Sequence, residues 1–158
     1  MSFAKIGTLV VALWCGSIAP AVASPSDVAI NGTYTAFSDG DWAKKNQVYY
    51  NELPVMSTWT VTSTCRTFMD CTGQVTTSQG WTGELKYRAG QWVVFHTVEG
   101  WVKCVGAPAV AGEQHFTFWV DPANPSQFIG LDKTVGPSGA CGINRWLTIE
   151  MPFKLTPI

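Results

Sequence analysis

Residues 55–65 read VMSTWTVTSTC, and this stretch decides the fold class. Apolar and small side chains fall on one side, while the other side, after Met56, carries only threonines. This two-residue period is typical of a half-buried β-strand. Threonine suits the solvated face because its branched Cβ fits the pleat and its hydroxyl stays in contact with water. We therefore predict a strand over 55–65 with one face turned toward an apolar core.

The same period recurs along the chain between short segments rich in glycine, proline, asparagine and aspartate. The pattern predicts strands over residues 32–38, 55–65, 71–78, 81–88, 91–98, 114–121, 127–133 and 145–155. Gln79-Gly80 and Ala89-Gly90 predict two-residue hairpin turns, in which glycine supplies the positive φ that such turns need.

Other local signals are weaker. A helical turn or two is expected over residues 41–50, which Asp41 could cap. Pro152 has no N–H to donate to a ladder, so it indicates an edge or a bulge in the last strand. We find no internal repeat and no interdomain linker.

Eight strands in hairpin sequence, with little chain left for covering helices, predict an all-β fold. We expect an antiparallel meander of about eight strands that closes, wholly or partly, into a barrel. A two-sheet β-sandwich is the alternative. The barrel is favoured because successive short hairpins need no long crossover, and because closure removes exposed strand edges.

The first 23 residues have the order of a secretory signal peptide. Lys5 is followed by the apolar run 6–18 and then by small residues up to Ala23. We predict cleavage after Ala23, which leaves residues 24–158 as a single disulfide-braced β domain, secreted or held in the cell envelope. A membrane anchor is disfavoured because glycine, serine and proline interrupt the run, and no later segment is apolar enough to span a bilayer.

Cleavage at this point would remove Cys15 and leave four cysteines, an even number in an oxidising compartment. Cys65 ends one predicted strand and Cys71 begins the next after the loop 66–70, so antiparallel pairing would place them opposite each other. Cys104 and Cys141 would then join two loops, although three pairings are formally open. A zinc site is disfavoured because the set contains no closely spaced pair. A catalytic thiol is disfavoured because such even sets are oxidised outside the cell.

Composition argues against partners that are attracted by charge. The net charge is −1, and the basic residues are scattered apart from Lys44-Lys45, so no field attracts nucleic acid or anionic lipid. We therefore predict no nucleic-acid partner. The chain is rich in tryptophan, which we interpret first as core packing and cross-strand pairing. The alternative is a ligand pocket lined by indole rings.

Candidate catalytic groups are few. His96 and His115 lie on separate predicted strands, and we interpret both as strand residues rather than bases. Asp39, Asp41 and Asp70 lie near loop ends, so spacing alone leaves open a hydrolase that uses one of them with a histidine. The sequence has no Gly-x-Ser-x-Gly elbow, no phosphate-binding loop and no His-Glu-x-x-His motif. We assign no catalytic, cofactor-binding or metal-binding residue, and we expect no cofactor.

Four segments stand out together: GTYTA at 32–36, DWAK at 41–44, STWT at 57–60 and TVGPSGACG at 134–142. In these segments the chain resembles small exported β-rich proteins of mycobacteria and related actinobacteria, a group of unknown function. The resemblance implies an envelope or extracellular location and transfers no active-site residue. The opening at 32–34 is also similar to the Gly-x-Trp opening of lipocalins, with tyrosine in place of tryptophan, which is an analogy of architecture only.

These observations favour a secreted binding protein without catalysis, whose partner is a small apolar ligand or an envelope component. An eight-stranded barrel has room for side chains or for one small ligand. The pocket hypothesis fails if Trp59, Phe116, Phe118 and Ile149 fill the interior. The alternative is a cell-surface protein-recognition module that uses exposed indoles and the lysines near Trp42. A hydrolase with one of the two histidines as base is the third hypothesis.

Overall fold

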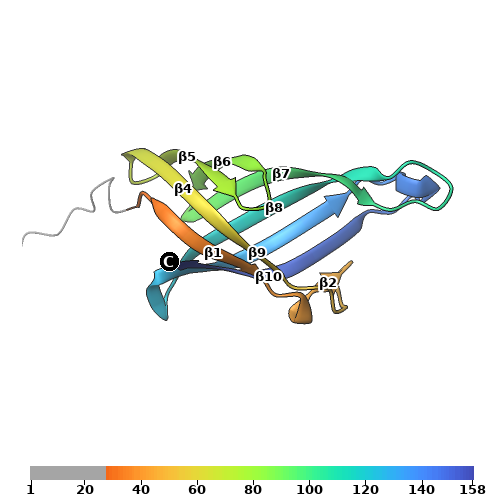
Figure 1. Ribbon diagram of the computed structural model, residues 1–158, viewed down its shortest axis with the longest axis horizontal. Coiled ribbons are helices and arrows are strands. Elements are labelled where there is room, and N and C mark those ends of the chain that lie inside the picture. The colour runs from red at the N-terminus through yellow and green to blue at the C-terminus, as the bar shows by residue number, and fades with distance from the viewer. Residues whose placement is uncertain (1–27) are drawn as a thin grey trace, which may run out of the picture.

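The computed structural model describes residues 28–158, which form a closed antiparallel barrel of eight strands (Figure 1). The barrel strands are β1 (Gly32–Ser38), β4 (Val55–Thr67), β5 (Asp70–Thr77), β6 (Thr82–Arg88), β7 (Gln91–Val102), β8 (Val110–Asp121), β9 (Asn124–Gly136) and β10 (Leu147–Pro157). From β4 onward each strand pairs with the next, and β1 closes the sheet by pairing with both β4 and β10. The predicted all-β barrel is confirmed, and the sandwich is excluded. The predicted signal peptide and Cys15 lie outside the described residues.

The segment between β1 and β4 differs from the prediction. The Asp39 carboxylate accepts a hydrogen bond from the Asp41 N–H at 3.1 Å and caps the short 3-10 helix η2 (Gly40–Trp42). The cap therefore lies two residues before the position predicted. The strands β2 (Lys44–Lys45) and β3 (Val48–Tyr49) then form a small hairpin that extends the sheet from β10, where a helical turn was expected. Within residues 28–158 no helix has the length and apolar character of a membrane span.

The connections between strands confirm one predicted turn and correct two others. Ala89 and Gly90 both have positive φ, 49° and 84°, as a two-residue hairpin requires. The β5–β6 connection is longer, over residues 78–81, and only its Gly80 has positive φ. In the β4–β5 hairpin the strands run closer to the tip than predicted, so the loop is reduced to residues 68–69.

Three strands continue beyond their predicted ends. β7, β8 and β9 were expected to stop at 98, start at 114 and stop at 133, yet they reach 102, 110 and 136. Glycines at positions 100, 112 and 136 interrupt the alternation of side chains there, and the β7–β8 ladder shifts register between Val98 and Val102, around Gly100. Together with β10 these extensions form an arm, residues 99–113 and 134–148, that projects from one end of the barrel (Figure 1).

Pro152 lies neither at a sheet edge nor at a bulge. β10 pairs with β1 over residues 153–157 and with β2 over 149–150, so Pro152 lies where β10 changes partner. Its carbonyl still accepts a hydrogen bond from the Asp39 N–H at 2.8 Å. The missing donor is therefore tolerated because the ladder is interrupted at this point on one side of the strand.

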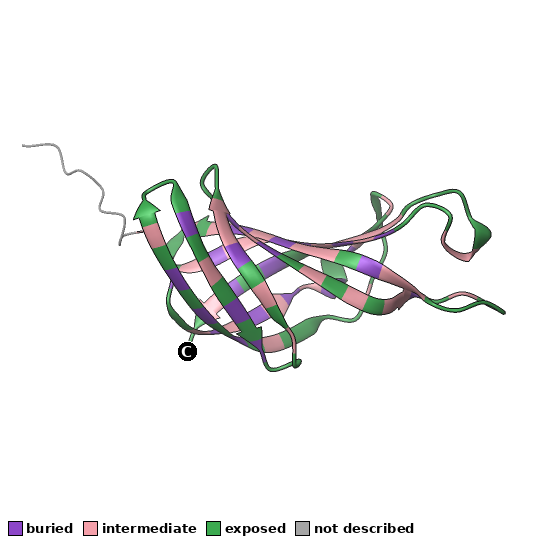
Figure 2. Ribbon diagram, turned by 90° about the horizontal axis from the view of Figure 1, so that it is seen from above, coloured by how far each residue is buried: buried purple, intermediate pink, exposed green. Residues whose placement is uncertain are grey.

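Buried and exposed residues alternate along the barrel strands (Figure 2). The half of the interior away from the arm is filled by aromatic rings. Trp59 lies edge-on to Phe116 and Phe118, with ring centroids 4.8 and 6.3 Å apart, and 5.2 Å from Phe153. Edge-to-face pairs of this kind stabilise a core beyond the area that they bury.

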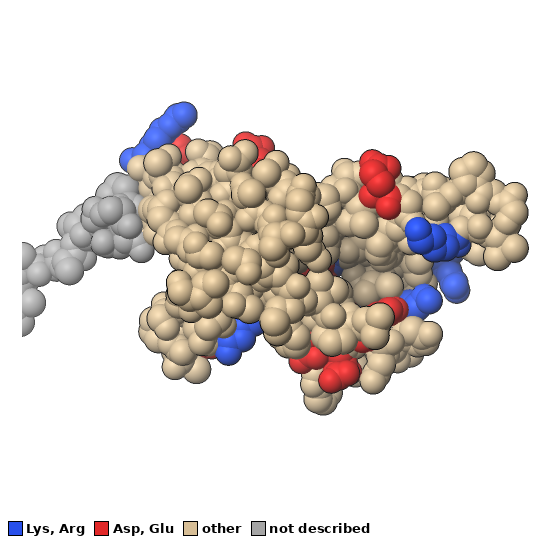
Figure 3. Space-filling view, in the orientation of Figure 1, with Lys and Arg blue, Asp and Glu red and all other residues tan. Residues whose placement is uncertain are grey.

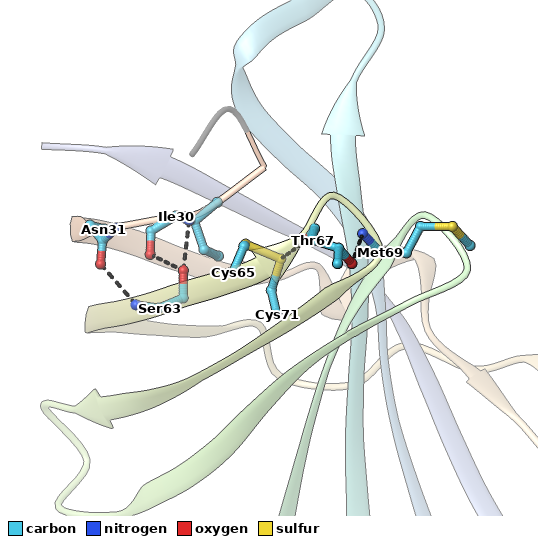
Figure 4. The surroundings of a disulfide bond; sticks show 7 residues. All are labelled: Ile30, Asn31, Ser63, Cys65, Thr67, Met69 and Cys71. Carbon is cyan, nitrogen blue, oxygen red and sulfur yellow. Dashed lines mark hydrogen bonds between the residues drawn. A yellow bond between two sulfur atoms is a disulfide. The ribbon is translucent and has the colours of Figure 1, made fainter. Parts of the chain in front are cut away.

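Residues 28–31 lead into β1 and lie beside β4 at Ser63 (Figure 4), and Val28 and Ile30 contact the aromatic core. The Ile30 N–H donates to Ser63 Oγ at 2.8 Å, and the same hydroxyl donates to the Ile30 carbonyl at 2.8 Å. The side chain of Asn31 accepts a hydrogen bond from the Ser63 N–H at 2.8 Å. Ile30 itself is buried against the aromatic core.

Both predicted disulfide bonds are present. Cys65 and Cys71 face each other across β4 and β5 and brace that hairpin (Figure 4). Cys104 and Cys141 join the β7–β8 loop to the 3-10 helix η3 (Ala140–Gly142) at the tip of the arm. The second bond therefore holds the two hairpins of the arm together.

Replacing Cys104 and Cys141 together by serine should lower the free energy of unfolding by about 3.9 kcal/mol, against about 2.4 kcal/mol for Cys65 and Cys71. The reason is that the longer ring removes more conformational entropy from the unfolded chain. Urea unfolding followed by tryptophan fluorescence measures both losses. A larger loss for the shorter ring would contradict this account.

Candidate functional site

The half of the barrel next to the arm is not filled. An open cavity of about 440 Å³ lies there, floored by Trp59, Phe116 and Phe153. Ile149 lines this cavity instead of filling it, so the interior is not packed solid. The volume lies within the range of small-molecule sites in proteins. The space-filling view shows a largely uncharged barrel surface on one side of the hollow and charged side chains of both signs on the arm and along the rim (Figure 3).

A buried carboxylate belongs to the cavity wall. Asp132, on β9, is 1% exposed, and its Oδ2 accepts a hydrogen bond from Ser38 Oγ at 2.7 Å. Its Oδ1 accepts a second from Gln114 Nε2 at 2.8 Å. Burial raises the pKa of Asp132, and the two hydrogen bonds oppose this with a smaller effect. Both donors are neutral, and the ion pair within residues 28–158, Lys86 with Glu84, lies elsewhere.

Trp81 and His96 form an aromatic wall of the cavity. Their rings are stacked, with centroids 4.3 Å apart and planes 11° from parallel, and Trp81 also stacks with Phe116 at 5.9 Å. Burial lowers the pKa of His96, while Glu113 raises it by less. His96 is therefore neutral at pH 7 and brings no positive charge to the cavity.

Trp101 lines the cavity on the side of the arm. Its ring lies over two glycines of the neighbouring strands: a Cβ on Gly112 would come within 2.8 Å of the indole, and one on Gly136 within 3.2 Å. A side chain at position 112 would therefore displace the ring, whereas at position 136 the closer obstacle is Val102, 2.5 Å from such a Cβ. The glycines that interrupt the strand pattern therefore place the indole against the cavity.

The structure separates the two histidines. His96 faces the cavity, whereas His115 lies on the outer face of β8 with its ring centroid 4.6 Å from that of Phe95. The loop-end carboxylates named from the sequence do not line the cavity: Asp39, Asp41 and Asp70. In the described part of the chain, no three side chains of His, Cys, Asp or Glu gather into a metal-binding group.

Sequence reasoning missed Asp132, Ser38 and Gln114. One signal was available, because Asp132 has the same parity as Phe128 in the strand predicted over 127–133. If the phenyl ring faces the core, so must the carboxylate. The signal was therefore a single acidic residue on the apolar face of a predicted strand, whereas the prediction considered only acidic residues near loop ends.

No protein-family model matches the chain, and no curated relative matches its sequence. Among solved structures, the chain is similar to the monomer form of the Mycobacterium tuberculosis PknI sensor domain, with a TM-score of 0.63 and 14% identity. The match covers 83% of this chain and 88% of that one. At this identity the likeness shows the fold alone. The resemblance to mycobacterial β-rich proteins therefore has support from the fold and none from sequence comparison.

Asp132→Asn should make the protein more stable at pH 7.5 and change little at pH 4.5. The folded protein holds the Asp132 proton more tightly than the unfolded chain, so its stability falls as pH rises from about 3.9 through the raised pKa. Asparagine removes this loss, and the Ser38 hydroxyl can accept from its amide. A tenfold difference in proton affinity is worth about 1.4 kcal/mol, which sets the scale of the gain.

Urea unfolding at the two pH values measures this effect, with Asp41→Asn as the matched control because Asp41 is exposed. The same pH dependence in both variants would contradict the account.

Proposed function

We propose that this chain is an exported binding protein without catalytic activity, and that one small, largely apolar molecule occupies the cavity next to the arm. The cavity itself carries the proposal, since it offers about 440 Å³ of open space beside the packed aromatic core. Ligand sites are typically concave and apolar, with a few convergent polar groups. Asp132, Ser38 and Gln114 are such groups here.

Export is part of the proposal. Two disulfide bonds are typical of proteins that fold in an oxidising compartment. The leader at 1–23 has the order of a signal peptide, and its removal after Ala23 would leave 24–158 as one domain, secreted or in the envelope. A barrel of this fold is named a sensor domain in M. tuberculosis PknI, which is in keeping with binding or recognition outside the cell.

Filling the cavity should abolish binding of a neutral apolar dye. Val98 lines the cavity, and Val93 lies on the outer face of the same strand, β7. We expect N-phenyl-1-naphthylamine to show saturable fluorescence enhancement with the natural protein. Val98→Trp should weaken its affinity at least tenfold, about 1.4 kcal/mol, because the indole takes the space of the dye. Val93→Trp should leave the affinity unchanged. Equal affinity in the two variants, or no saturable binding to the natural protein, would overturn the proposal.

A second candidate function is protein recognition at an exposed aromatic patch. Trp42 is 62% exposed, and its ring centroid lies 6.3 Å from that of Tyr49. Lys44 Nζ lies 5.3 Å above the Tyr49 ring, and Lys45 Nζ lies 5.0 Å above the Tyr50 ring. Exposed aromatic residues are enriched among the residues that contribute most to protein interfaces. The observation favours an envelope protein as the partner of this patch.

Trp42→Ala separates the two functions. The dye affinity should stay unchanged, because Trp42 does not line the cavity next to the arm. If the patch docks an envelope protein, the share of the protein that sediments with the cell envelope should fall several-fold. Phe95→Ala, which removes another exposed ring, is the control. Unchanged sedimentation would remove this second candidate.

A further inference from the structure

We propose that the ligand of the cavity is a small organic cation: an ammonium group carried on an apolar body. This inference rests on the binding function proposed above and adds the chemical class of the ligand. It is carried by a buried acid without a cationic partner, by the lack of lysine and arginine among the residues that line the cavity, and by the indole rings in its walls.

Asp132 and Glu52 line the cavity, while no lysine or arginine within residues 28–158 does so. A buried charge is costly unless it is paired, and the donors to Asp132, Ser38 and Gln114, are neutral. A cation in the cavity would pair with the ionised form of Asp132, whereas an anion would find no lysine or arginine to pair with. His96 does not change this balance, because it is neutral at pH 7.

Access to the carboxyl group of Asp132 is restricted. Asp132 is 1% exposed, so a ligand must reach it past a neighbour. Gln114 is that neighbour: it lines the cavity, is half-buried and donates to Asp132 Oδ1 at 2.8 Å. If its flexible side chain turns aside, an ammonium N–H can donate to Oδ1 in its place. The exchange replaces a neutral donor by a charged one, and charge-assisted hydrogen bonds are the stronger kind.

Three indole rings belong to the walls of the cavity. The Trp101 ring packs against Gly112 and Gly136 and also lines the cavity. Trp81 and Trp59 complete the indole surfaces around the same space. Indole is the aromatic ring that attracts cations most strongly, and it also packs against the apolar body of a ligand. These walls therefore suit the same class of molecule as the buried acid.

Three probes with one apolar body test the inference at pH 7.5: 2-naphthylmethylammonium, the neutral 2-naphthylmethanol and the anionic 2-naphthoate. Each competes with N-phenyl-1-naphthylamine for the cavity. We expect the cation to bind at least tenfold more tightly than the alcohol, and the carboxylate to bind most weakly. Val98→Trp should weaken all three, because it fills the shared space.

Asp132→Asn is the decisive variant. It should bring the affinity of the cation to within about threefold of the alcohol, and a cooperative urea unfolding transition shows that the variant folds. Glu52→Gln is the matched control at the other carboxylate and should retain the preference for the cation. Loss of the preference in Glu52→Gln alone would overturn the assignment to Asp132.

Proton release gives a second readout in the natural protein. Asp132 holds its proton more tightly than an ordinary carboxyl group, so binding of the cation should release protons and weaken as pH falls, while binding of the alcohol should not. The other titratable groups that line the cavity are His96 and Glu52. The profile should therefore persist in His96→Gln and in Glu52→Gln. Titration calorimetry in buffers of different ionisation enthalpy measures the protons released.

The outcomes separate the two proposals. If the cation and the alcohol bind equally and Val98→Trp weakens both, the cation inference is wrong while the binding function stands. If neither the dye nor any probe binds, both proposals fail. If the cation is preferred and Asp132→Asn removes the preference, both are supported.

Discussion

The pairing of β1 with both β4 and β10 is the interaction on which the rest of the structure depends. It turns an open meander into a closed barrel, so the eight strands have backbone partners on both sides and no barrel edge is exposed. Closure also decides which residues face inward, because a slip of one residue in any strand would turn its whole set of side chains outward. The β2–β3 hairpin can join β10 only where β1 has ended.

In the closed barrel, the inward-facing side chains of β8 and β9 change from aromatic to polar in the same direction along the barrel axis. The inward-facing residues of β9 are, in chain order, Phe128, Gly130, Asp132 and Thr134. β8 runs in the opposite direction, and its inward-facing residues are, in chain order, Gln114, Phe116 and Phe118. In this register Phe118 lies opposite Gly130 and Phe116 opposite Asp132, whereas Gln114 lies opposite Thr134, so the aromatic rings of β8 give way to polar side chains toward the arm. The packed core and the cavity are therefore two parts of one gradient along the barrel axis.

This gradient explains why stability and binding can reside in different parts of one small fold. The aromatic half carries the apolar burial, the Cys65–Cys71 bond braces its β4–β5 hairpin, and residues 28–31 bond to Ser63 of β4. The other half tolerates a buried acid that a packed core would exclude, because Ser38 and Gln114 satisfy part of its hydrogen-bonding capacity. The likeness to a sensor domain from M. tuberculosis concerns the fold, whereas the candidate site is argued from the side chains of this chain.

The sequence by itself determined what depends on neighbours along the chain. Alternation located all eight barrel strands, Ala89-Gly90 specified its turn, and Cys65 and Cys71 were placed opposite each other by their own hairpin. Only the tertiary structure decided which half of the barrel stays open, and it brought Ser38 to Asp132 across 94 residues of chain. The physical reason is that strand order and parity are local properties. The meeting of two side chains across the barrel depends instead on the register of every ladder between them, and closure of the whole sheet sets that register.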